Sequence, residues 1–284
     1  MKQALIWASG GTGFTFTDDE MEADVILVNT CCFIGDAKEE SVNTILEMAR
    51  LKEEGACRAL IVTGCLAQRY KQEILDEIPE VDAILGTTSY EDVAGIVKQV
   101  LEGRGTTHLT SFHDLGELPD TKAARVVTTG GYYAFLKIAE GCDKRCTYCI
   151  IPYLRGPYRS VPMEQLLEEA RQLAQGGVKE LILVAQETTL YGKDIYGEKS
   201  LPKLLHELAQ IPGIQWIRIQ YCYPEEITDG LIEAIRTEEK VCHYLDIPIQ
   251  HASNRILKRM GRRTNREELT ERIAKLRREI PDIA

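Results

Sequence analysis

The sequence predicts an α/β protein with two domains, a doubly wound N-terminal α/β domain followed by an incomplete β/α partial TIM barrel. In residues 1–102, short apolar runs alternate with helical patterns, which is typical of a parallel sheet covered by helices. From residue 132 to residue 284 the alternation continues in longer strand–helix units, as in a β/α barrel. The intervening residues 103–131 are polar and aperiodic, and we interpret them as a linker.

The first domain is expected to hold four short strands, each apolar enough to be buried on both faces of a sheet. These strands are predicted at Ala4–Ala8, Val25–Asn29, Ala59–Thr63 and Val81–Leu85. Helices are predicted at Ala37–Glu54, Gln68–Glu77 and Tyr90–Leu101. Ser89 stands where it could cap the last of these helices. The glycine-rich segment Ser9–Gly13 lacks the Lys-Ser/Thr of a phosphate-binding loop, so we interpret it as a turn.

The second domain is expected to contain four strand–helix units. Its strands are predicted at Tyr133–Ile138, Glu180–Ala185, Trp216–Tyr221 and Tyr244–Ile249. Its helices are predicted at Met163–Gln175, Leu201–Gln210, Glu225–Arg236, Asn254–Met260 and Arg266–Ile280. Polar residues follow the strands where a β/α barrel places its reactive groups; they are Gln186, Glu187, Tyr223, Glu225, Gln250 and His251.

The composition argues against a membrane-spanning protein, a disulfide-rich protein and a general nucleic-acid-binding protein. Hydrophobic residues make up 44% of the 284 residues, and there is no apolar run of about 18 residues that could span a membrane. The chain has nine cysteines, several in one loop, which favours metal binding in a reducing cytoplasm over disulfides. The net charge of −10 is unfavourable for general nucleic-acid binding. Two local basic patches remain open as binding surfaces or solvated faces: Lys144, Arg145, Arg155 and Arg159, and Lys258, Arg259, Arg262 and Arg263.

The most informative segment carries Cys142, Cys146 and Cys149, with three and then two residues between them, directly after a strand and Gly141. Three thiolates on one loop can hold three irons of a cubane cluster and leave the fourth iron without a protein ligand. Structural zinc takes four ligands, usually as two Cys-x-x-Cys pairs, and this loop has no second pair. A zinc knuckle or three buried free thiols remain the alternatives.

Further cysteines follow two predicted strands of the first domain. Cys31 and Cys32 come after one strand, and Cys65 comes after the next. Because the carboxyl ends of parallel strands meet at one edge of a sheet, Cys31 and Cys65 are expected to lie at the same edge. Buried thiols are the alternative here as well. Cys57 precedes its strand and is interpreted as structural.

The pattern Cys-x3-Cys-x-aromatic-Cys, with Tyr148 as the aromatic residue, is identified as the signature of the radical S-adenosylmethionine (SAM) enzymes. The chain further resembles the methylthiotransferases, the two-cluster branch of these enzymes, in residues 23–31, 63–70, 85–87, 184–192 and 246–252. Residues 151–160 resemble the RimO branch, which modifies an aspartate of a small-subunit ribosomal protein.

This resemblance implies a fold, cofactors and roles. A [4Fe-4S] cluster on Cys142, Cys146 and Cys149 would bind SAM and, with an electron from an external donor, give a deoxyadenosyl radical that takes a hydrogen from the β-carbon of the aspartate. A second cluster in the N-terminal domain, with Cys31 and Cys65 as ligands, would carry the sulfur. Gln186 and Glu187 are the expected polar contacts of SAM, although the family commonly has aspartate at the latter position. Tyr148 is expected to pack against the adenine.

The sequence also departs from the family. The family holds its second cluster with three cysteines, and Met1 to Thr15 contains none, so Cys31 and Cys65 have no obvious third partner, although Cys32 is adjacent. The end of the barrel and a small C-terminal β-barrel of the family are also missing. We therefore expect a chain truncated at both ends that cannot complete sulfur insertion. The alternatives are a tRNA adenosine methylthiotransferase and a non-catalytic cluster- or zinc-binding fragment.

Overall fold

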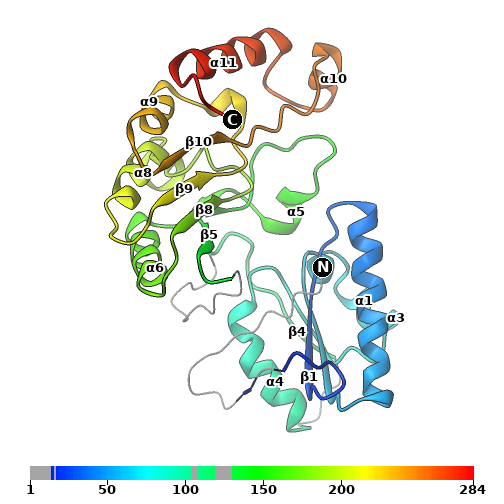
Figure 1. The fold of residues 1–284 in the computed structure, drawn as a ribbon. Helices are drawn as coiled ribbons and strands as arrows, with labels where there is room; N and C mark the ends of the chain where they lie inside the picture. The colour runs from blue at the N-terminus through cyan, green and yellow to red at the C-terminus, as the bar shows by residue number, and fades with distance from the viewer. Residues whose placement is uncertain (1–13, 16, 104–107, 119–129) are drawn as a thin grey trace. The chain divides into compact units, whose positions relative to one another are not determined.

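The computed structural model describes residues 14–15, 17–103, 108–118 and 130–284. The chain folds as two compact units, Met1–Val126 with Tyr153–Arg155, and Val127–Pro152 with Gly156–Ala284 (Figure 1). The predicted strand Ala4–Ala8 and the predicted turn Ser9–Gly13 lie outside the described residues. Among the described residues, no helix is both long and apolar enough to cross a membrane.

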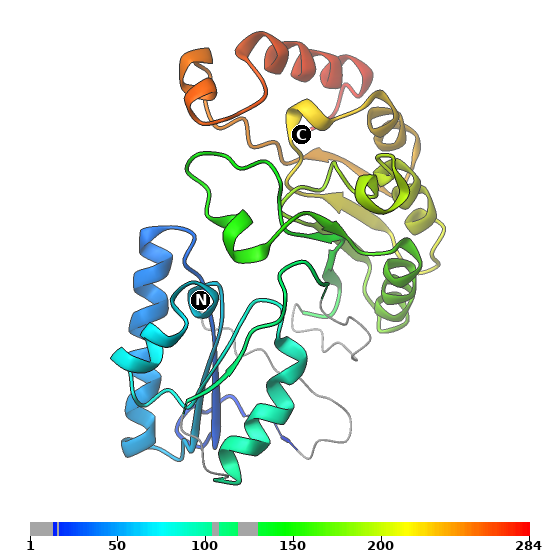
Figure 2. The ribbon, with the colours of Figure 1, turned by 180° about the vertical axis from the view of Figure 1, so that it is seen from behind.

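The first unit contains a parallel four-stranded sheet in the order β1-β2-β3-β4. Its strands are β1 (Val25–Thr30), β2 (Ala59–Gly64), β3 (Ala83–Leu85) and β4 (Leu109–Ser111). Its helices are α1 (Gly35–Glu54), α2 (Cys65–Tyr70), α3 (Gln72–Glu77) and α4 (Val93–Leu101), the last preceded by the 3-10 turn η1 (Tyr90–Asp92). Figures 1 and 2 show α1 and α4 on opposite sides of the sheet, which confirms the doubly wound α/β class.

Three details of this unit differ from the sequence-based expectation. The predicted helix Gln68–Glu77 is split in two, because Lys71 has a φ of 45° and interrupts the helical backbone. Ser89 makes no side-chain cap; its hydroxyl accepts a hydrogen bond from the Nα of His113 instead, at 2.9 Å. Strand β4 lies within residues 103–131, where a linker was expected, because a three-residue polar strand gives no periodic signal.

The second unit contains a parallel sheet in the order β10-β9-β8-β5. Its strands are β5 (Tyr133–Lys137), β8 (Glu180–Val184), β9 (Trp216–Ile219) and β10 (Val241–Leu245). Its longer helices are α6 (Met163–Gln175), α8 (Leu201–Ala209), α9 (Asp229–Thr237) and α11 (Arg266–Glu279). Both views place α6, α8 and α9 along one face of this sheet, as in part of a β/α barrel (Figures 1 and 2).

Several short elements of this unit were not predicted. Strands β6 (Ala139–Glu140) and β7 (Arg159–Ser160) form an antiparallel pair. Helix α7 (Lys193–Tyr196) and the 3-10 turn η2 (Pro224–Glu226) were also not predicted, nor was α5 (Ile151–Arg155), of which Tyr153–Arg155 belong to the first unit. The short helix α10 (Asn254–Arg259) was predicted. Strand β10 begins three residues before the predicted segment Tyr244–Ile249 and ends ahead of Pro248, which cannot donate to a sheet. The β6–β7 pair matters most, because it brackets the three-cysteine loop.

Candidate functional site

The three-cysteine loop leaves β6 and returns to β7, and a glycine makes this closure possible. Gly141 has a φ of 80°, and a Cβ at this position would lie 2.0 Å from the carbonyl oxygen of Pro157. The Nα of Cys142 donates a hydrogen bond to the carbonyl oxygen of Gly156 at 3.2 Å. Any side chain at position 141 would therefore push the two ends of the loop apart.

The three cysteines of the loop differ in their exposure to solvent. Cys142 and Cys146 are each 6% exposed, Cys149 is half-buried, and the Nα of Cys149 donates to the carbonyl oxygen of Cys146 at 2.9 Å. Burial raises the pKa of the Cys142 thiol to about 11, and negative charge on Glu187, Cys149 and Cys146 adds to this effect. In the described part of the chain, no three Cys, His, Asp or Glu side chains are arranged to hold a metal ion.

Lys144 ties the middle of the loop to the rest of the second unit. Its side chain is only 7% exposed, and its ammonium group forms an ion pair with Glu226 of η2. The same nitrogen lies 3.8 Å from Oε2 of Glu187, which follows β8, and 3.8 Å from Oε1 of Glu225. Although burial opposes it, the ammonium groups of Lys144 and Lys199 lower the pKa of Glu226 to about 2. The loop is thus anchored by a buried charge network.

A second buried cation stands beside the loop. The Arg262 side chain is fully buried, and its guanidinium carbon lies 4.1 Å from the ring centroid of Tyr223. The Lys144 ammonium lies 4.9 Å from the same centroid, and the Tyr223 hydroxyl lies 4.0 Å from Sγ of Cys146. For Lys144 and Arg262, the alternative of a solvated basic face is therefore wrong, since acidic and aromatic partners hold both cations inside the unit.

Gln186 and Glu187 follow β8 and offer buried acceptors. Gln186 donates through Nε2 to Oε1 of Glu140 at 2.9 Å, while its own Oε1 is buried without a hydrogen-bond partner among the described residues. Glu187 is fully buried; its Oε1 accepts from the Nα of Thr189 at 3.0 Å, and its Oε2 has no hydrogen-bond donor in the described structure. Burial raises the pKa of Glu187 to about 7. Oε2 of Glu187 faces the Lys144 ammonium at 3.8 Å, so among the described residues the unpartnered acceptor is Oε1 of Gln186, which suits a ligand that carries an ammonium group.

Other residues predicted at the strand ends do not join this group. Gln250 and His251 are exposed. Tyr148, on the cysteine loop, is 47% exposed but lies beside Cys146, because burial and then negative charge on Cys146 raise the pKa of Tyr148 to about 12. His251 accepts a hydrogen bond through Nδ1 from the Nα of Ser253 at 2.8 Å, within its own turn. Conversely, sequence reasoning gave no site role to Glu226 and placed Arg262 only in a candidate basic patch. Two features of the sequence could have indicated this charge network. One is Lys144 between two candidate ligands, and the other is the acidic pair Glu225-Glu226 after a strand.

The first unit places its cysteines as strand register requires. Thr30 of β1 pairs with Gly64 of β2, so Cys31 and Cys65 follow at the same edge of the sheet. Gly64 has a φ of 95°, and a Cβ there would lie 2.5 Å from the carbonyl oxygen of Thr30. Cys31 is exposed, whereas Cys32 is 2% exposed and directs its Sγ to the carbonyl oxygen of Cys65 at 3.2 Å. The thiol turned toward Cys65 is therefore that of Cys32.

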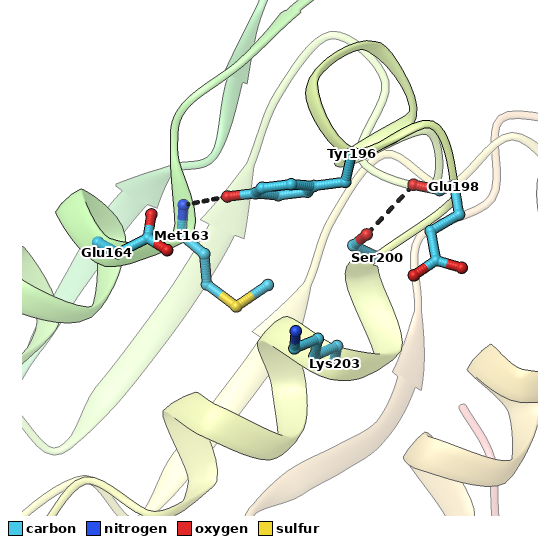
Figure 3. Close-up of a pocket in the computed structure, with 6 residues that line it drawn as sticks. All are labelled: Met163, Glu164, Tyr196, Glu198, Ser200 and Lys203. Atoms are coloured by element: carbon cyan, nitrogen blue, oxygen red, sulfur yellow. Dashed lines mark hydrogen bonds between the residues drawn. The ribbon is translucent and has the colours of Figure 1, made fainter.

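A small cavity of about 110 Å³ lies elsewhere in the second unit (Figure 3). Its lining comes from α6, the segment from α7 to α8, and α8: Met163, Glu164, Tyr196, Glu198, Ser200 and Lys203. The Tyr196 hydroxyl accepts a hydrogen bond from the Nα of Met163 at 2.8 Å and so satisfies the start of α6. None of the predicted site residues lines this cavity, which we interpret as a feature of the helical layer.

Comparison with known proteins identifies the family. Residues 136–284 match the radical SAM superfamily, and residues 3–86 match the uncharacterized protein family UPF0004. The chain is 68% identical over 272 residues to the ribosomal protein uS12 methylthiotransferase RimO of Lachnoclostridium phytofermentans. It is 53% identical over 274 residues to the protein of that name from Acetivibrio thermocellus. These alignments cover 96% and 95% of this chain but only 61% and 60% of the relatives.

Solved structures agree at the level of the fold. The radical SAM methyltransferase TsrM from Kitasatospora setae superposes with a TM-score of 0.60 at 14% identity, covering 90% of this chain and 54% of that one. The cobalamin-dependent SAM radical enzyme OxsB gives 0.59 at 13% identity, covering 89% and 39%. Together with the match over more than half of the sequence and the three-cysteine loop, these likenesses show that the chain belongs to the radical SAM superfamily.

Proposed function

We propose that this chain is the cluster- and SAM-binding part of a methylthiotransferase that modifies ribosomal protein uS12. The observation that carries the proposal is the three-cysteine loop, whose base closes at Gly141 and whose centre is anchored by Lys144. The names of the relatives at 68% and 53% identity support uS12 as the substrate. An aspartate side chain as the modified group follows from the resemblance of residues 151–160 to the RimO branch.

The residues present suit the cofactors that the superfamily implies. Three thiols on one loop form the donor set of an iron–sulfur cluster with one open iron, so Cys142, Cys146 and Cys149 would hold it. Bound there, the cluster and SAM would supply the one-electron chemistry that activates a carbon–hydrogen bond of the substrate. The buried Oε1 of Gln186, to which none of the described residues donates a hydrogen bond, would accept one from the ammonium group of SAM. Glu187, whose Oε2 lies 3.8 Å from the Lys144 ammonium, is the second proposed contact.

Each surrounding residue contributes positioning and electrostatics. Lys144 keeps its part of the loop near the ends of β8 and η2, and Glu140 orients the amide of Gln186. Glu187 carries less negative charge near neutral pH than an ordinary glutamate, since burial raises its pKa to about 7. Cys31 and Cys65, at one edge of the first unit's sheet, are the proposed ligands of a second cluster. An external electron donor and a cytoplasmic location complete the proposal.

The test is anaerobic reconstitution of the chain with iron and sulfide, followed by reaction with SAM, a reductant and uS12. We expect reductive cleavage of SAM by this chain, detected as 5′-deoxyadenosine. From the sequence extended to the full length of its relatives, we expect a methylthio group on an aspartate of uS12, detected by mass spectrometry. A methylthio group on tRNA but not on uS12 would replace the substrate with the tRNA alternative. Bound zinc with intact SAM would favour a non-catalytic fragment.

A further inference from the structure

Tyr223 connects the three-cysteine loop to two buried cations. It lies just beyond β9, is 6% exposed, and places its hydroxyl 4.0 Å from Sγ of Cys146. This separation is long for oxygen partners but falls within the range of hydrogen bonds to the larger sulfur atom. The ring itself lies under the ammonium of Lys144 and the guanidinium of Arg262.

The direction of the hydrogen bond depends on the state of Cys146. As a free thiol, Cys146 could donate to the tyrosine or accept from it. As a metal ligand, Cys146 is a thiolate without a proton. A phenol is protonated at neutral pH, so Tyr223 must then be the donor. Cations over an aromatic ring draw on its electron density, and Lys144 and Arg262 therefore make the Tyr223 hydroxyl a stronger donor.

We propose that Tyr223 is a positioning residue that donates a hydrogen bond to Sγ of Cys146 in the loaded chain and raises the reduction potential of the cluster. Reduction adds negative charge that spreads onto the ligand sulfurs, and a hydrogen bond to such a sulfur stabilises the reduced form. The buried positive charge of Arg262, fully shielded from solvent, acts in the same direction. The inference rests on the cluster site of the proposed function, but it concerns an electronic property rather than the substrate.

The test compares Tyr223→Phe with Tyr221→Phe in the anaerobically reconstituted chain, without SAM. Tyr221 is the matched control, since its ring centroid lies 6.2 Å from that of Tyr223 and its hydroxyl bonds to no cysteine among the described residues. A reductive titration followed by electron paramagnetic resonance gives the midpoint potential, and chemical analysis gives the iron content. We expect Tyr223→Phe to keep its iron. At a fixed potential, its ratio of reduced to oxidised cluster should be about five-fold lower, which corresponds to the free energy of one hydrogen bond.

An unchanged potential in Tyr223→Phe, at full iron content, would overturn the inference, as would an equal decrease in Tyr221→Phe. If Tyr223→Phe fails to hold iron, a monofluorinated tyrosine at position 223 keeps the ring and strengthens the donor. That substitution is expected to raise the potential, and no change would overturn the inference. Absence of iron from the unsubstituted chain would overturn the proposed function together with this inference, whereas iron with an unaltered potential would overturn this inference alone.

Discussion

The cysteines of the second unit and those of the first unit reach their positions in different ways. Cys142, Cys146 and Cys149 lie on one loop, whose closure needs only Gly141 and the β6–β7 pair. Cys31 and Cys65 lie 34 positions apart in the sequence, and the parallel register of β1 and β2 brings them to one edge. The first arrangement is local, whereas the second depends on the tertiary structure of a sheet.

This difference explains why one cysteine set can be assigned with more detail than the other. Spacing within a single loop defines which three thiols belong together. At the sheet edge, the sequence does not distinguish Cys31 from its neighbour Cys32 as the partner of Cys65. In the structure, the buried Cys32 is the one whose thiol points toward Cys65. A motif divided between strands therefore leaves the choice of ligand to local side-chain direction.

The largest effect is expected from removing a ligand of the three-cysteine loop. Cys146→Ala should lower reductive SAM cleavage by at least about 100-fold. Losing a residue that only supports a metal ligand costs up to about 100-fold, and losing the ligand itself should cost more. The control is Cys242→Ala, because Cys242 is a half-buried residue of β10 outside the loop. Cleavage is measured as 5′-deoxyadenosine released under reducing conditions. Equal activity of the two variants would show that the loop does not hold the reactive cluster.

The next effect concerns the anchor of that loop. Lys144→Met leaves Glu226, Glu187 and Glu225 without their shared buried cation and should lower the free energy of unfolding by about 3 kcal/mol. Lys199→Met is the matched control, since Lys199 also pairs with Glu226, at 2.7 Å, but is 26% exposed; it should cost about 1 kcal/mol or less. Urea unfolding of the cluster-free chain measures both. Similar costs would mean that burial of Lys144 adds nothing.

A pH dependence should distinguish Glu187 from the rest of the network. Its pKa is about 7 in the folded chain against 4.5 in the unfolded chain, so the folded state binds an extra proton between these values. The free energy of unfolding of the unsubstituted chain should therefore fall as pH rises through this window. Glu187→Gln lacks this loss and should gain up to about 3 kcal/mol relative to the parent between pH 4.5 and 8.

Glu226 serves as the internal control for this pH series. Its pKa is about 2 in the folded chain against 4.5 in the unfolded chain, so the stability that it adds grows with pH mainly below the window, and the parent and the Gln variant share this contribution. Parallel stability curves for the parent and Glu187→Gln from pH 4.5 to 8 would contradict the raised pKa of Glu187.

The smallest expected effect separates Cys32 from Cys31 in the cluster-free chain. Cys32→Ala removes a buried thiol and its hydrogen bond to Cys65, and should cost about 1 kcal/mol of unfolding free energy. Cys31→Ala alters an exposed side chain and should change stability by less than about 0.5 kcal/mol. Chemical unfolding measures the pair. The reverse order would mean that the thiol of Cys31, not that of Cys32, packs into the first unit.

Much of the fold could be predicted from the sequence, since buried parallel strands and amphipathic helices have strong periodic signals. Helix α6 has the predicted bounds, Met163–Gln175, and β1 and β2 extend the predicted strands by one residue each. Short elements were missed because they have no period to detect; β4 and the β6–β7 pair are examples. The break at Lys71 depends on a backbone conformation that composition does not signal.

The candidate site was predictable only where its geometry is local. The spacing of the three cysteines identified their loop, but the roles of Lys144 and Arg262 were not evident, since charged residues usually lie at the surface. Arg262 lies between α10 and α11, while its ring partner Tyr223 follows β9. Only the folded second unit brings these residues together.

The most direct test of the account compares iron and sulfide content, with electron paramagnetic resonance of the reduced sample, in two multiple variants. One is Cys31→Ala/Cys65→Ala and the other is Cys142→Ala/Cys146→Ala/Cys149→Ala, each reconstituted anaerobically. We predict that the first variant keeps about four irons per chain, the content of one cubane cluster, and still cleaves SAM, whereas the second does not cleave SAM. Zinc without iron in the first variant, or SAM cleavage by the second, would contradict the assignment of the radical chemistry to the three-cysteine loop.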